Sequence, residues 1–326
     1  MKKVTARSIV IAIVLLALAV IAEAQQAKIH EIGWLTANTV FFAGRYEEFI
    51  QELKKFGYIE KKNIVFKHLS AEGNLNRLPV LADDLVRQNV EVIVTRGTPE
   101  VLALKKATTT IPIVFYSVTD PVGAGLVNSL ARPGSNITGF STIEAILAGK
   151  RLELLKEVVP KLSRVAVLWN PNDLSSYQQF KETQDSAREL ALQLHSMEVS
   201  SSDRYDVAFK EAVNAGSRAL AVIAGSLEDT NAKRISDLVL KNRLPTIYPR
   251  EAFLASGGLL SYGSDPSEPI RVIALMVDKI LKGTKPADIP VEQPKKFSMV
   301  INLKTAKQIG LTIPPNVLAR ADKVIR

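Results

Sequence analysis

The sequence contains no cysteine, and histidine is almost as scarce, with three residues in 326. The absence of cysteine excludes disulfide bonds, thiolate metal sites and cysteine nucleophiles, and it also excludes a lipidated cysteine behind a signal segment. His30, His68 and His195 fall in different predicted elements without the spacing of metal ligands, so we expect no zinc site. No G-x-S-x-G motif of a serine hydrolase is present. The sequence therefore predicts a protein that is not an enzyme and holds no cofactor.

Long apolar runs are also missing, with one exception at the N-terminus. Three basic residues precede the apolar run 9–22, and Ala22-Glu23-Ala24 follows it. A basic start, a short apolar run and small residues are typical of a cleaved secretory signal peptide. The run is shorter than the roughly 20 apolar residues that a membrane-spanning helix needs. We therefore predict a signal peptide over residues 1–24 and a periplasmic mature protein that is not a lipoprotein, the alternative being a retained membrane anchor.

The charge is basic but dispersed, with a formal net charge of +9. Basic residues occur in scattered pairs such as Lys54-Lys55 and Lys295-Lys296, without the interleaved aromatic side chains of a nucleic-acid platform. No helix-turn-helix pattern precedes the first predicted strand, which disfavours a gene regulator. The sequence predicts no nucleic-acid partner.

Short apolar runs rich in β-branched residues alternate with segments of helical periodicity along the whole chain. This alternation predicts βα units and parallel sheets. It forms two runs of about 120 residues each, which meet near residues 137–142. The predicted fold is α/β, with two Rossmann-like lobes: residues 28–140 plus 265–296 form lobe 1, and residues 141–264 plus 297–326 form lobe 2. Residues 144–158 and 122–130 are among the predicted helices.

A glycine-rich loop, "SVTDPVGAGLV" at residues 117–127, follows one of the buried strands. The dinucleotide fingerprint G-x-G-x-x-G needs a third glycine that this loop lacks, so a nucleotide site is disfavoured. The alternative is a tight helix start with Asp120 as N-cap and Pro121 at the first helical position.

Ligands of open parallel sheets bind beyond the carboxyl ends of the strands. We expect these ends to line an interlobe cleft rich in hydroxyl, amide and aromatic groups, which suits a small molecule. The candidate ligand-binding residues are Thr36, Asn38, Thr95, Gly97, Ser117, Thr119, Asp120, Asn170, Ser226, Tyr248 and Tyr262.

Tyr248 and Tyr262 each lie near a point where the chain is expected to change lobe. For each tyrosine there are two interpretations. The ring contacts the ligand, or it packs in the hinge and its hydroxyl group forms a hydrogen bond with the backbone. We predict that Tyr262 contacts the ligand and that Tyr248 is mainly structural.

Three long segments carry a resemblance to a known family. They are "IPIVFYSVTDPVGAGLVNSLARPGSNITGFS", "NRLPTIYPREAFLASGGLLSYGSD" and "VDKILKGTKPADIPVEQPKKFSMVINLKTAKQIGLTIPPNVLARADKVI". They resemble the ABC transporter substrate-binding protein family that includes tryptophan-binding members. The resemblance implies a type I periplasmic binding protein, a clam-shell of two lobes joined by hinge crossings. It also implies a small ligand, aromatic or amino-acid-like, and an ABC permease of the inner membrane as partner.

The resemblance comes with one departure. Amino-acid-binding members are expected to carry an acidic residue just after the strand at 219–225, where it meets the ligand's ammonium group. Here Gly225-Ser226 stand at that place, and Glu228 and Asp229 come slightly later. The function that we predict is an extracytoplasmic solute receptor of an ABC importer. A ligand-sensing ectodomain of a signalling system and an exported α/β enzyme are the alternatives.

Overall fold

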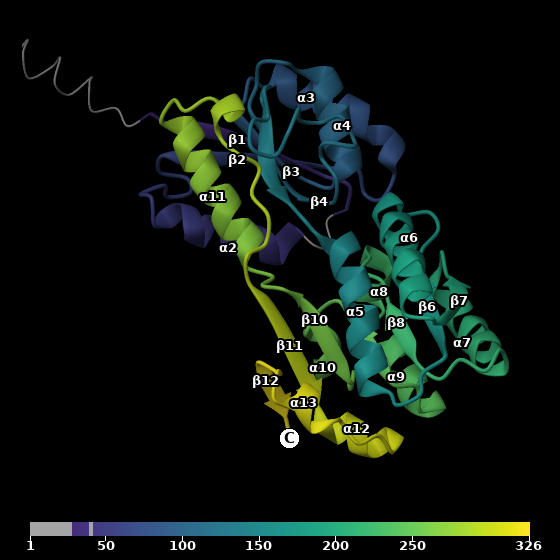
Figure 1. Cartoon of the computed structure of the whole chain (residues 1–326). Coiled ribbons are helices and arrows are strands. Elements are labelled where there is room, and N and C mark those ends of the chain that lie inside the picture. The colour runs from purple at the N-terminus through teal and green to yellow at the C-terminus, as the bar shows by residue number, and fades with distance from the viewer. Residues whose placement is uncertain (1–27, 39–41) are drawn as a thin grey trace, which may run out of the picture. The chain divides into compact units, whose positions relative to one another are not determined.

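The computed structural model describes residues 28–38 and 42–326 (Figure 1). The predicted signal peptide, residues 1–24, lies outside the described residues. Within the described ranges, none of the helices combines the length and the apolar character needed to cross a membrane. The chain divides into two compact units, and each is assembled from separate segments. Unit 1 comprises the chain up to Phe115 with Gly125–Gly139 and Ile270–Pro290, and unit 2 comprises Tyr116–Ala124, Phe140–Pro269 and Val291–Arg326.

Unit 1 is built on a five-stranded sheet with the strand order β2-β1-β3-β4-β5. β1 pairs in parallel with β2 and with β3, so that Trp34 lies between His68 on one side and Val94 on the other. Buried apolar residues run along β3 and β4 without alternation, as expected for strands covered on both faces. The strands are β1 His30–Thr36, β2 Ile64–Ser70, β3 Val92–Arg96, β4 Ile113–Val118 and β5 Ile137–Ser141.

The helices of unit 1 cover the two faces of this sheet, with α3 and α4 on one side and α2 and α11 on the other (Figure 1). Leu78, Leu81 and Leu85 of α3 are buried, which is the helical spacing that the sequence shows. The elements are α2 Phe42–Lys54, α3 Leu78–Arg87, α4 Thr98–Ala107, α11 Glu268–Leu281 and the short 3₁₀ helices η1 Leu75–Arg77 and η3 Pro286–Asp288.

The helix predicted for residues 122–130 is wrong, because this segment consists of turns. The Asp120 carboxylate accepts a hydrogen bond from the Gly123 amide at 2.8 Å, and the Ala124 amide donates to the Asp120 carbonyl at 3.0 Å. Gly125 then adopts a positive φ of 65°, a left-handed conformation that stops a helix from continuing. Asp120 therefore closes a single turn instead of capping a helix.

Unit 2 contains a seven-stranded sheet with the strand order β7-β6-β8-β9-β10-β11-β12. Its strand pairs are parallel except for β10 with β11, which are antiparallel. The strands are β6 Arg164–Trp169, β7 Gln193–Glu198, β8 Leu220–Val222, β9 Thr246–Tyr248, β10 Leu260–Ser264, β11 Phe297–Asn302 and β12 Lys323–Ile325.

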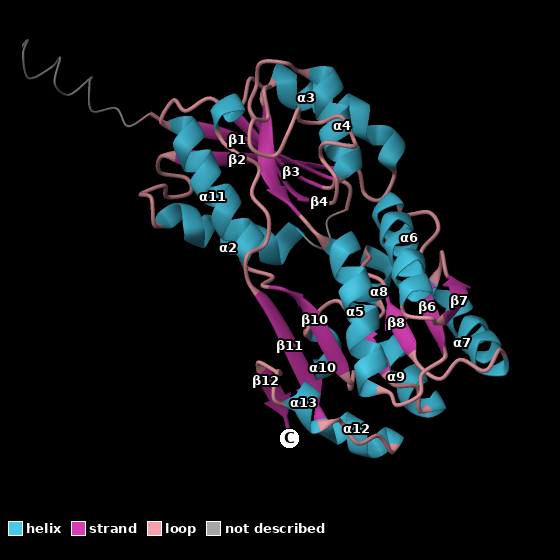
Figure 2. Ribbon diagram, viewed as in Figure 1, coloured by secondary structure: helices cyan, strands magenta, loops and turns pink. Residues whose placement is uncertain are grey.

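Helices cover both faces of this second sheet (Figure 2, helices in cyan and strands in magenta). They are α5 Glu144–Val158, α6 Leu174–Glu189, α7 Tyr205–Asn214, α8 Ser226–Thr230, α9 Ala232–Asn242, α10 Ala252–Ala255, α12 Leu303–Ile309, α13 Pro315–Leu318 and the 3₁₀ helix η2 Ser202–Arg204.

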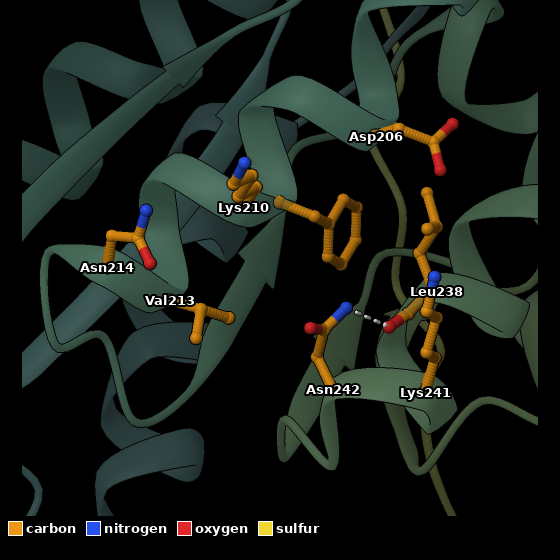
Figure 3. Close-up of a pocket in the computed structure, with 8 residues that line it drawn as sticks. Asp206, Lys210, Val213, Asn214, Leu238, Lys241 and Asn242 are labelled. Carbon is orange, nitrogen blue, oxygen red and sulfur yellow. Dashed lines mark hydrogen bonds between the residues drawn. The ribbon is translucent and has the colours of Figure 1, made fainter.

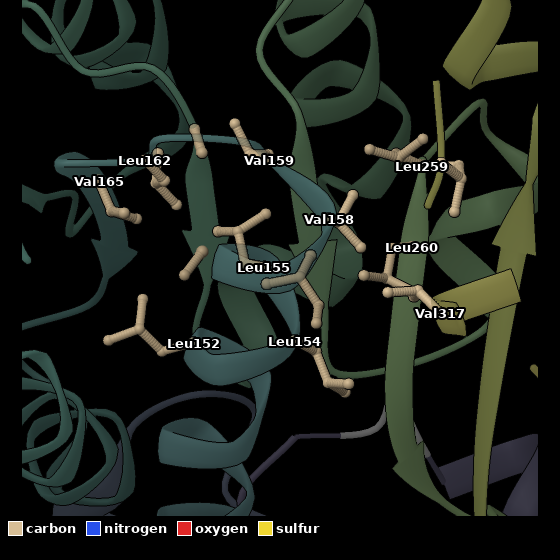
Figure 4. Packing of buried hydrophobic residues seen from close by; sticks show 14 of the residues in the cluster. Leu152, Leu154, Leu155, Val158, Val159, Leu162, Val165, Leu259, Leu260 and Val317 are labelled. Atoms are coloured by element: carbon tan, nitrogen blue, oxygen red, sulfur yellow. The ribbon is translucent and has the colours of Figure 1, made fainter. Parts of the chain in front are cut away.

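Side-chain alternation along the strands divides the core of unit 2 into two layers. Ile247 belongs to the layer that contains α5, whereas the next residue, Tyr248, belongs to the layer beneath α7 and α9. Figure 4 shows the first layer, where Leu155 of α5 and Leu260 of β10 share one buried cluster with Val317 of α13. The C-terminal segment of the chain therefore contributes to the core of unit 2.

The two sheets share one strand order. In each, the second strand of the unit lies outside the first, and the third, fourth and fifth strands follow on the other side. The mostly parallel strands and flanking helices of both units confirm the predicted α/β class.

Candidate functional site

The candidate residues of unit 1 lie at the carboxyl ends of β1 and β3, which are neighbours in the sheet. Thr36 and Thr95 belong to the strands themselves, at or next to the last residue, and Asn38 and Gly97 follow the strands. The Thr36 hydroxyl lies 2.9 Å from Nε2 of His68, and the Thr95 hydroxyl donates to the Leu35 carbonyl at 2.9 Å. Burial lowers the pKa of His68, which favours the neutral imidazole as the partner of Thr36. Asn38 is exposed. The structure thus brings Thr36 and Thr95 close together, with both hydroxyls bonded within the sheet.

Gly97 stands between β3 and α4, where a buried carboxylate folds back on it. Gly97 has a φ of 84°, and a Cβ at this position would lie 3.0 Å from Oε2 of Glu100. Oε1 of Glu100 accepts a hydrogen bond from the Ala37 amide at 3.0 Å. Burial raises the pKa of Glu100. Glu100 therefore ties the loop after β1 to the start of α4.

In unit 2, hydroxyl groups gather around Thr119, in the segment that follows β4. The Thr119 hydroxyl lies 2.8 Å from the Ser175 hydroxyl, and the Thr142 hydroxyl donates to it at 3.4 Å. Ser117, two residues earlier, has a positive φ of 59°. A non-glycine residue is rarely found in this conformation, which redirects the chain at the end of the strand.

The N-terminus of α6 lies beside this hydroxyl cluster and is capped by Asp173. The Asp173 carboxylate accepts from the Ser175 amide at 2.8 Å and from the Ser176 amide at 3.2 Å. The Asn170 amide donates to the Ser176 hydroxyl at 2.9 Å, and the Asn170 side chain accepts from the Asn172 amide at 3.0 Å. The loop after β6 is therefore ordered by its own polar groups.

Gln179 holds the end of β8 in place next to this loop. Its side-chain amide donates to the Ala224 carbonyl at 3.0 Å and accepts from the Ala224 amide at 3.2 Å. Gln179 is fully buried, so both hydrogen bonds are shielded from water. Gly225 and the short helix α8, which begins at Ser226, follow directly.

Glu228, in α8, is fully buried, and neither of its carboxylate oxygens has a hydrogen-bond partner. Burial raises its pKa to about 7, and the nearby carboxylates of Asp173 and Asp229 act in the same direction. Its own backbone N–H and the Arg250 guanidinium act the other way, the former without reaching hydrogen-bond geometry. Near neutral pH, both the protonated and the ionised form of the Glu228 carboxyl group are therefore populated.

Two arginines follow further along the sheet of unit 2, and each is already paired. Arg250, after β9, forms an ion pair with Asp229. Arg151 of α5 is 2.6 Å from Glu144, and its Nε donates to the Tyr262 carbonyl at 2.7 Å. Within each pair the two charges cancel. The remaining carboxyl groups, those of Asp173 and Glu228, therefore give this edge of the sheet more acidic than basic groups.

The two candidate tyrosines have different surroundings. Tyr248 is fully buried, and its ring stacks on Phe253 with centroids 4.7 Å apart. Tyr262 is partly exposed, and its ring lies 6.3 Å from that of Phe297. Whether either ring touches a ligand stays a prediction.

Tyr248→Leu and Tyr262→Leu are expected to act on different properties. Tyr248→Leu removes a buried stacked ring, so the melting temperature of the ligand-free protein is expected to fall. Tyr262→Leu is expected to weaken ligand binding while the ligand-free melting temperature changes little. Thermal melts and calorimetric titrations of both variants check this, and a Tyr262→Leu variant that binds normally but melts early would contradict it.

Four charged residues at these edges were not predicted as site residues: Glu100, Arg151, Glu228 and Arg250. A signal for two of them exists in the sequence. In each unit, the glycine just before the helix that follows the third strand is followed three residues later by glutamate, as Gly97 with Glu100 and Gly225 with Glu228. The arginines have no comparable pattern, because their pairing becomes visible only in the folded unit.

A separate pocket of about 280 Å³ opens between α7 and α9 of unit 2 (Figure 3). Figure 3 shows Asn242 donating to the Leu238 carbonyl at 2.7 Å at its edge. Its lining comprises Asp206, Phe209, Lys210, Val213, Asn214, Leu238, Lys241 and Asn242. None of the predicted ligand-binding residues lines it. Among the described residues, no cluster of His, Cys, Asp and Glu has a metal-binding arrangement.

Comparison with known proteins identifies the family. The model of the family described as "ABC transporter substrate binding protein" matches residues 43–325. The chain belongs to this family. It is 29% identical over 263 residues to a "Tyrosine-binding protein" of Clostridioides difficile (strain R20291), a match that covers 81% of this chain and 75% of the relative.

Solved structures also resemble this family member over most of its length. A conserved domain protein of Vibrio cholerae is 29% identical to this chain, with a TM-score of 0.81. The match covers 91% of this chain and 100% of that protein. An ABC domain from Streptococcus pneumonia, solved in complex with L-Trp, is 26% identical with a TM-score of 0.80 and has the same coverage. These matches confirm the predicted family and the type I periplasmic binding protein fold class.

Proposed function

We propose that this substrate-binding protein captures a small aromatic amino acid or a close analogue outside the cytoplasm and delivers it to an ABC permease of the inner membrane. The family supports the binding role, and relatives named for tyrosine and solved with L-Trp support the ligand class. The observation that carries the proposal is the polar edge of unit 2, where the Thr119 and Ser175 hydroxyls lie 2.8 Å apart beside the capped start of α6. The proposed role is binding without catalysis.

The proposed ligand contacts come from loops after the strands of both units, as expected for parallel sheets. When the ligand binds, hydroxyl and amide groups of these loops give up hydrogen bonds to each other and form hydrogen bonds to the ligand. These new hydrogen bonds fix the orientation of the ligand. Ligand binding then shifts the protein toward its ligand-bound conformation, which is the form that the permease receives.

Alanine substitution of Thr36, Thr119 and Asn170 tests these contacts. Each variant is expected to weaken binding of L-tryptophan or L-tyrosine by roughly 1 kcal/mol or more, because a buried polar partner is left unpaired. Isothermal titration calorimetry measures the change. Ser201→Ala, an exposed serine of unit 2, serves as the control and is expected to bind as the wild type does. Unchanged affinity in all three variants would remove the proposed site.

Intact-mass measurement of the protein from the membrane-free extracytoplasmic fraction tests the cellular part of the proposal. A chain that begins after Ala24 is expected for a released periplasmic receptor. A chain that begins at Met1 and stays with the membrane would instead support a ligand-sensing ectodomain. Native mass spectrometry of the same preparation identifies a copurified ligand, and turnover of that ligand during incubation would contradict a role without catalysis.

A further inference from the structure

The pocket between α7 and α9 has an apolar floor. Phe209 of α7 and Leu238 of α9 line it, and both belong to the buried core layer beneath these helices. Val213, one turn after Phe209, also lines the pocket and is 41% exposed. In Figure 3, Val213 and Leu238 lie on opposite sides of the pocket. An apolar group that enters would therefore cover apolar surface that water now contacts.

The size of the pocket limits what can enter it. Its volume is about 280 Å³. A closed apolar cavity of about 150 Å³ is enough to hold benzene. The pocket therefore has room for one aromatic ring, or a short branched chain, together with a small charged group. Sites for larger ligands have volumes of roughly 300–1,000 Å³, so the pocket suits a ligand with a single ring.

Two lysines line the pocket, Lys210 from α7 and Lys241 from α9 (Figure 3). Within the part of the chain that the structure describes, neither ammonium group forms an ion pair or a hydrogen bond. The long apolar stem of a lysine can lie along an apolar ligand while its ammonium group reaches a charge at the ligand's end. The two helices thus supply two positive charges to one apolar pocket.

The carboxylates of the two helices do not neutralise these lysines. Asp206 lines the pocket, but it pairs with Arg234 at 2.5 Å. Asp237 of α9 pairs with Lys233 at 2.8 Å. Glu211, the remaining acidic residue of α7, is not among the lining residues. The carboxylate that would pair with the two lysines therefore has to come from a ligand.

The carboxyl ends of both helices also contribute to the charge of the pocket. Asn214 and Asn242 line it, and they are the last residues of α7 and α9. A helix carries about half a negative charge at its carboxyl end. The two ends together bring less charge than the two lysines, so the pocket is positive on balance and favours an anion.

The pocket is separate from the candidate ligand site of unit 2. Thr119 and Asn170 of that site form hydrogen bonds to residues in the first turn of α6. The pocket instead extends to the last residues of α7 and α9. A ligand in this pocket would therefore not occupy the candidate site.

We propose that this pocket is a second binding site of the protein and takes a small amphipathic anion, namely one aromatic ring or short branched chain that bears a carboxylate. The apolar part contacts Phe209, Val213 and Leu238. The carboxylate pairs with Lys210 and Lys241. This site goes beyond the proposed function, because none of the predicted ligand-binding residues lines it.

Methyl NMR of the ligand-free protein tests the site with 3-phenylpropionate as probe. The methyl signals of Val213 and Leu238 are expected to shift and to saturate in about the millimolar range, as suits a ligand of about eleven non-hydrogen atoms. The neutral 3-phenylpropionamide and the cationic 3-phenylpropylammonium are expected to bind at least about fivefold more weakly. Added salt is expected to weaken binding of the anion, because exposed charges are screened.

Val213→Phe tests whether the anion enters the pocket. The larger side chain fills the space, and the exposed position accepts it without disturbing the core. Binding of 3-phenylpropionate, followed through the Leu238 methyl signals, is expected to be lost. Val207→Phe is the matched control, because Val207 is 43% exposed on the same helix and does not line the pocket. This control is expected to bind as the wild type does.

The double variant Lys210→Gln with Lys241→Gln tests the charge. It is expected to lose at least about fivefold in affinity for 3-phenylpropionate, together with the preference for this anion over the neutral amide. Lys233→Gln is the control, because Lys233 lies in α9 but does not line the pocket. It is expected to keep both the affinity and the preference.

Three results would overturn the proposal. The first is that the Val213 and Leu238 signals do not shift with 3-phenylpropionate up to about 20 mM, well above the expected Kd. The second is equal binding of the anionic, neutral and cationic probes. The third is wild-type binding by Val213→Phe. Each of them would leave the proposed function standing, because no residue proposed to contact the transported ligand is changed.

Discussion

Arg151→Met is expected to lower the free energy of unfolding by about 3–5 kcal/mol, which would be the largest effect among the substitutions considered. The Arg151 side chain is 2% exposed, and it supplies donors to both the Glu144 carboxylate and the Tyr262 carbonyl. Methionine fills similar volume but leaves the Glu144 charge buried without a counterion. Urea denaturation of the ligand-free protein near neutral pH measures the change.

The neighbouring residue offers a matched control. Lys150 is also in α5 and forms an ion pair with Glu153, but both side chains are more than two-fifths exposed. Lys150→Met is therefore expected to change stability by less than about 1 kcal/mol. The double variant Arg151→Met with Glu144→Gln is expected to recover part of the loss, because no buried charge is left unpaired. A loss below about 1 kcal/mol for Arg151→Met alone would contradict this account.

Glu228→Gln is expected to change how stability depends on pH, by about 3 kcal/mol between pH 4.5 and 7. The folded state raises the pKa of Glu228 from 4.5 to about 7. Over this interval the folded protein keeps the proton that the unfolded chain gives up, so stability falls as pH rises and levels off above about pH 7. Glutamine cannot titrate, so the variant loses this part of the slope.

Denaturation of the wild type and Glu228→Gln at a series of pH values checks the expected difference. The variant is expected to be the more stable protein above about pH 7, because it does not bury a charge. Glu211→Gln, at an exposed position of α7, is the control and is expected to follow the wild-type pH profile. Parallel profiles of the wild type and Glu228→Gln would show that Glu228 titrates as an ordinary glutamate.

Local sequence patterns predicted most elements of the fold, because burial on a strand or a helix leaves a periodicity in the residues themselves. The predicted helix at 144–158 matches α5, and the buried run at 111–117 contains β4 apart from its last residue. The prediction failed at 122–130, where hydrogen bonds of the Asp120 side chain and the left-handed Gly125 favour turns over a helix. Local hydrogen bonding outweighed apolar spacing there.

The sequence indicates where the candidate residues stand along the chain, but not which groups they contact in the folded units. Thr119 is a candidate because it follows a strand, whereas its partner Ser175 lies 56 residues further along the chain. Tyr248 could have faced either side of its strand, and its register in the sheet places it in the layer beneath α7 and α9. Contacts between residues so far apart in sequence depend on how strands pair, which no local pattern encodes.

By itself, the sequence determined the α/β class, the order of most elements and the resemblance to the substrate-binding family, because hydrophobic periodicity and long shared segments are properties of adjacent residues. Only the tertiary structure decided that the two sheets share one strand order and that Glu100 and Glu228 are equivalent. It also decided that one of them has a donor and the other has none. The pKa and the partners of a carboxylate follow from burial and from charges brought together by folding, and those are set by neighbours in space.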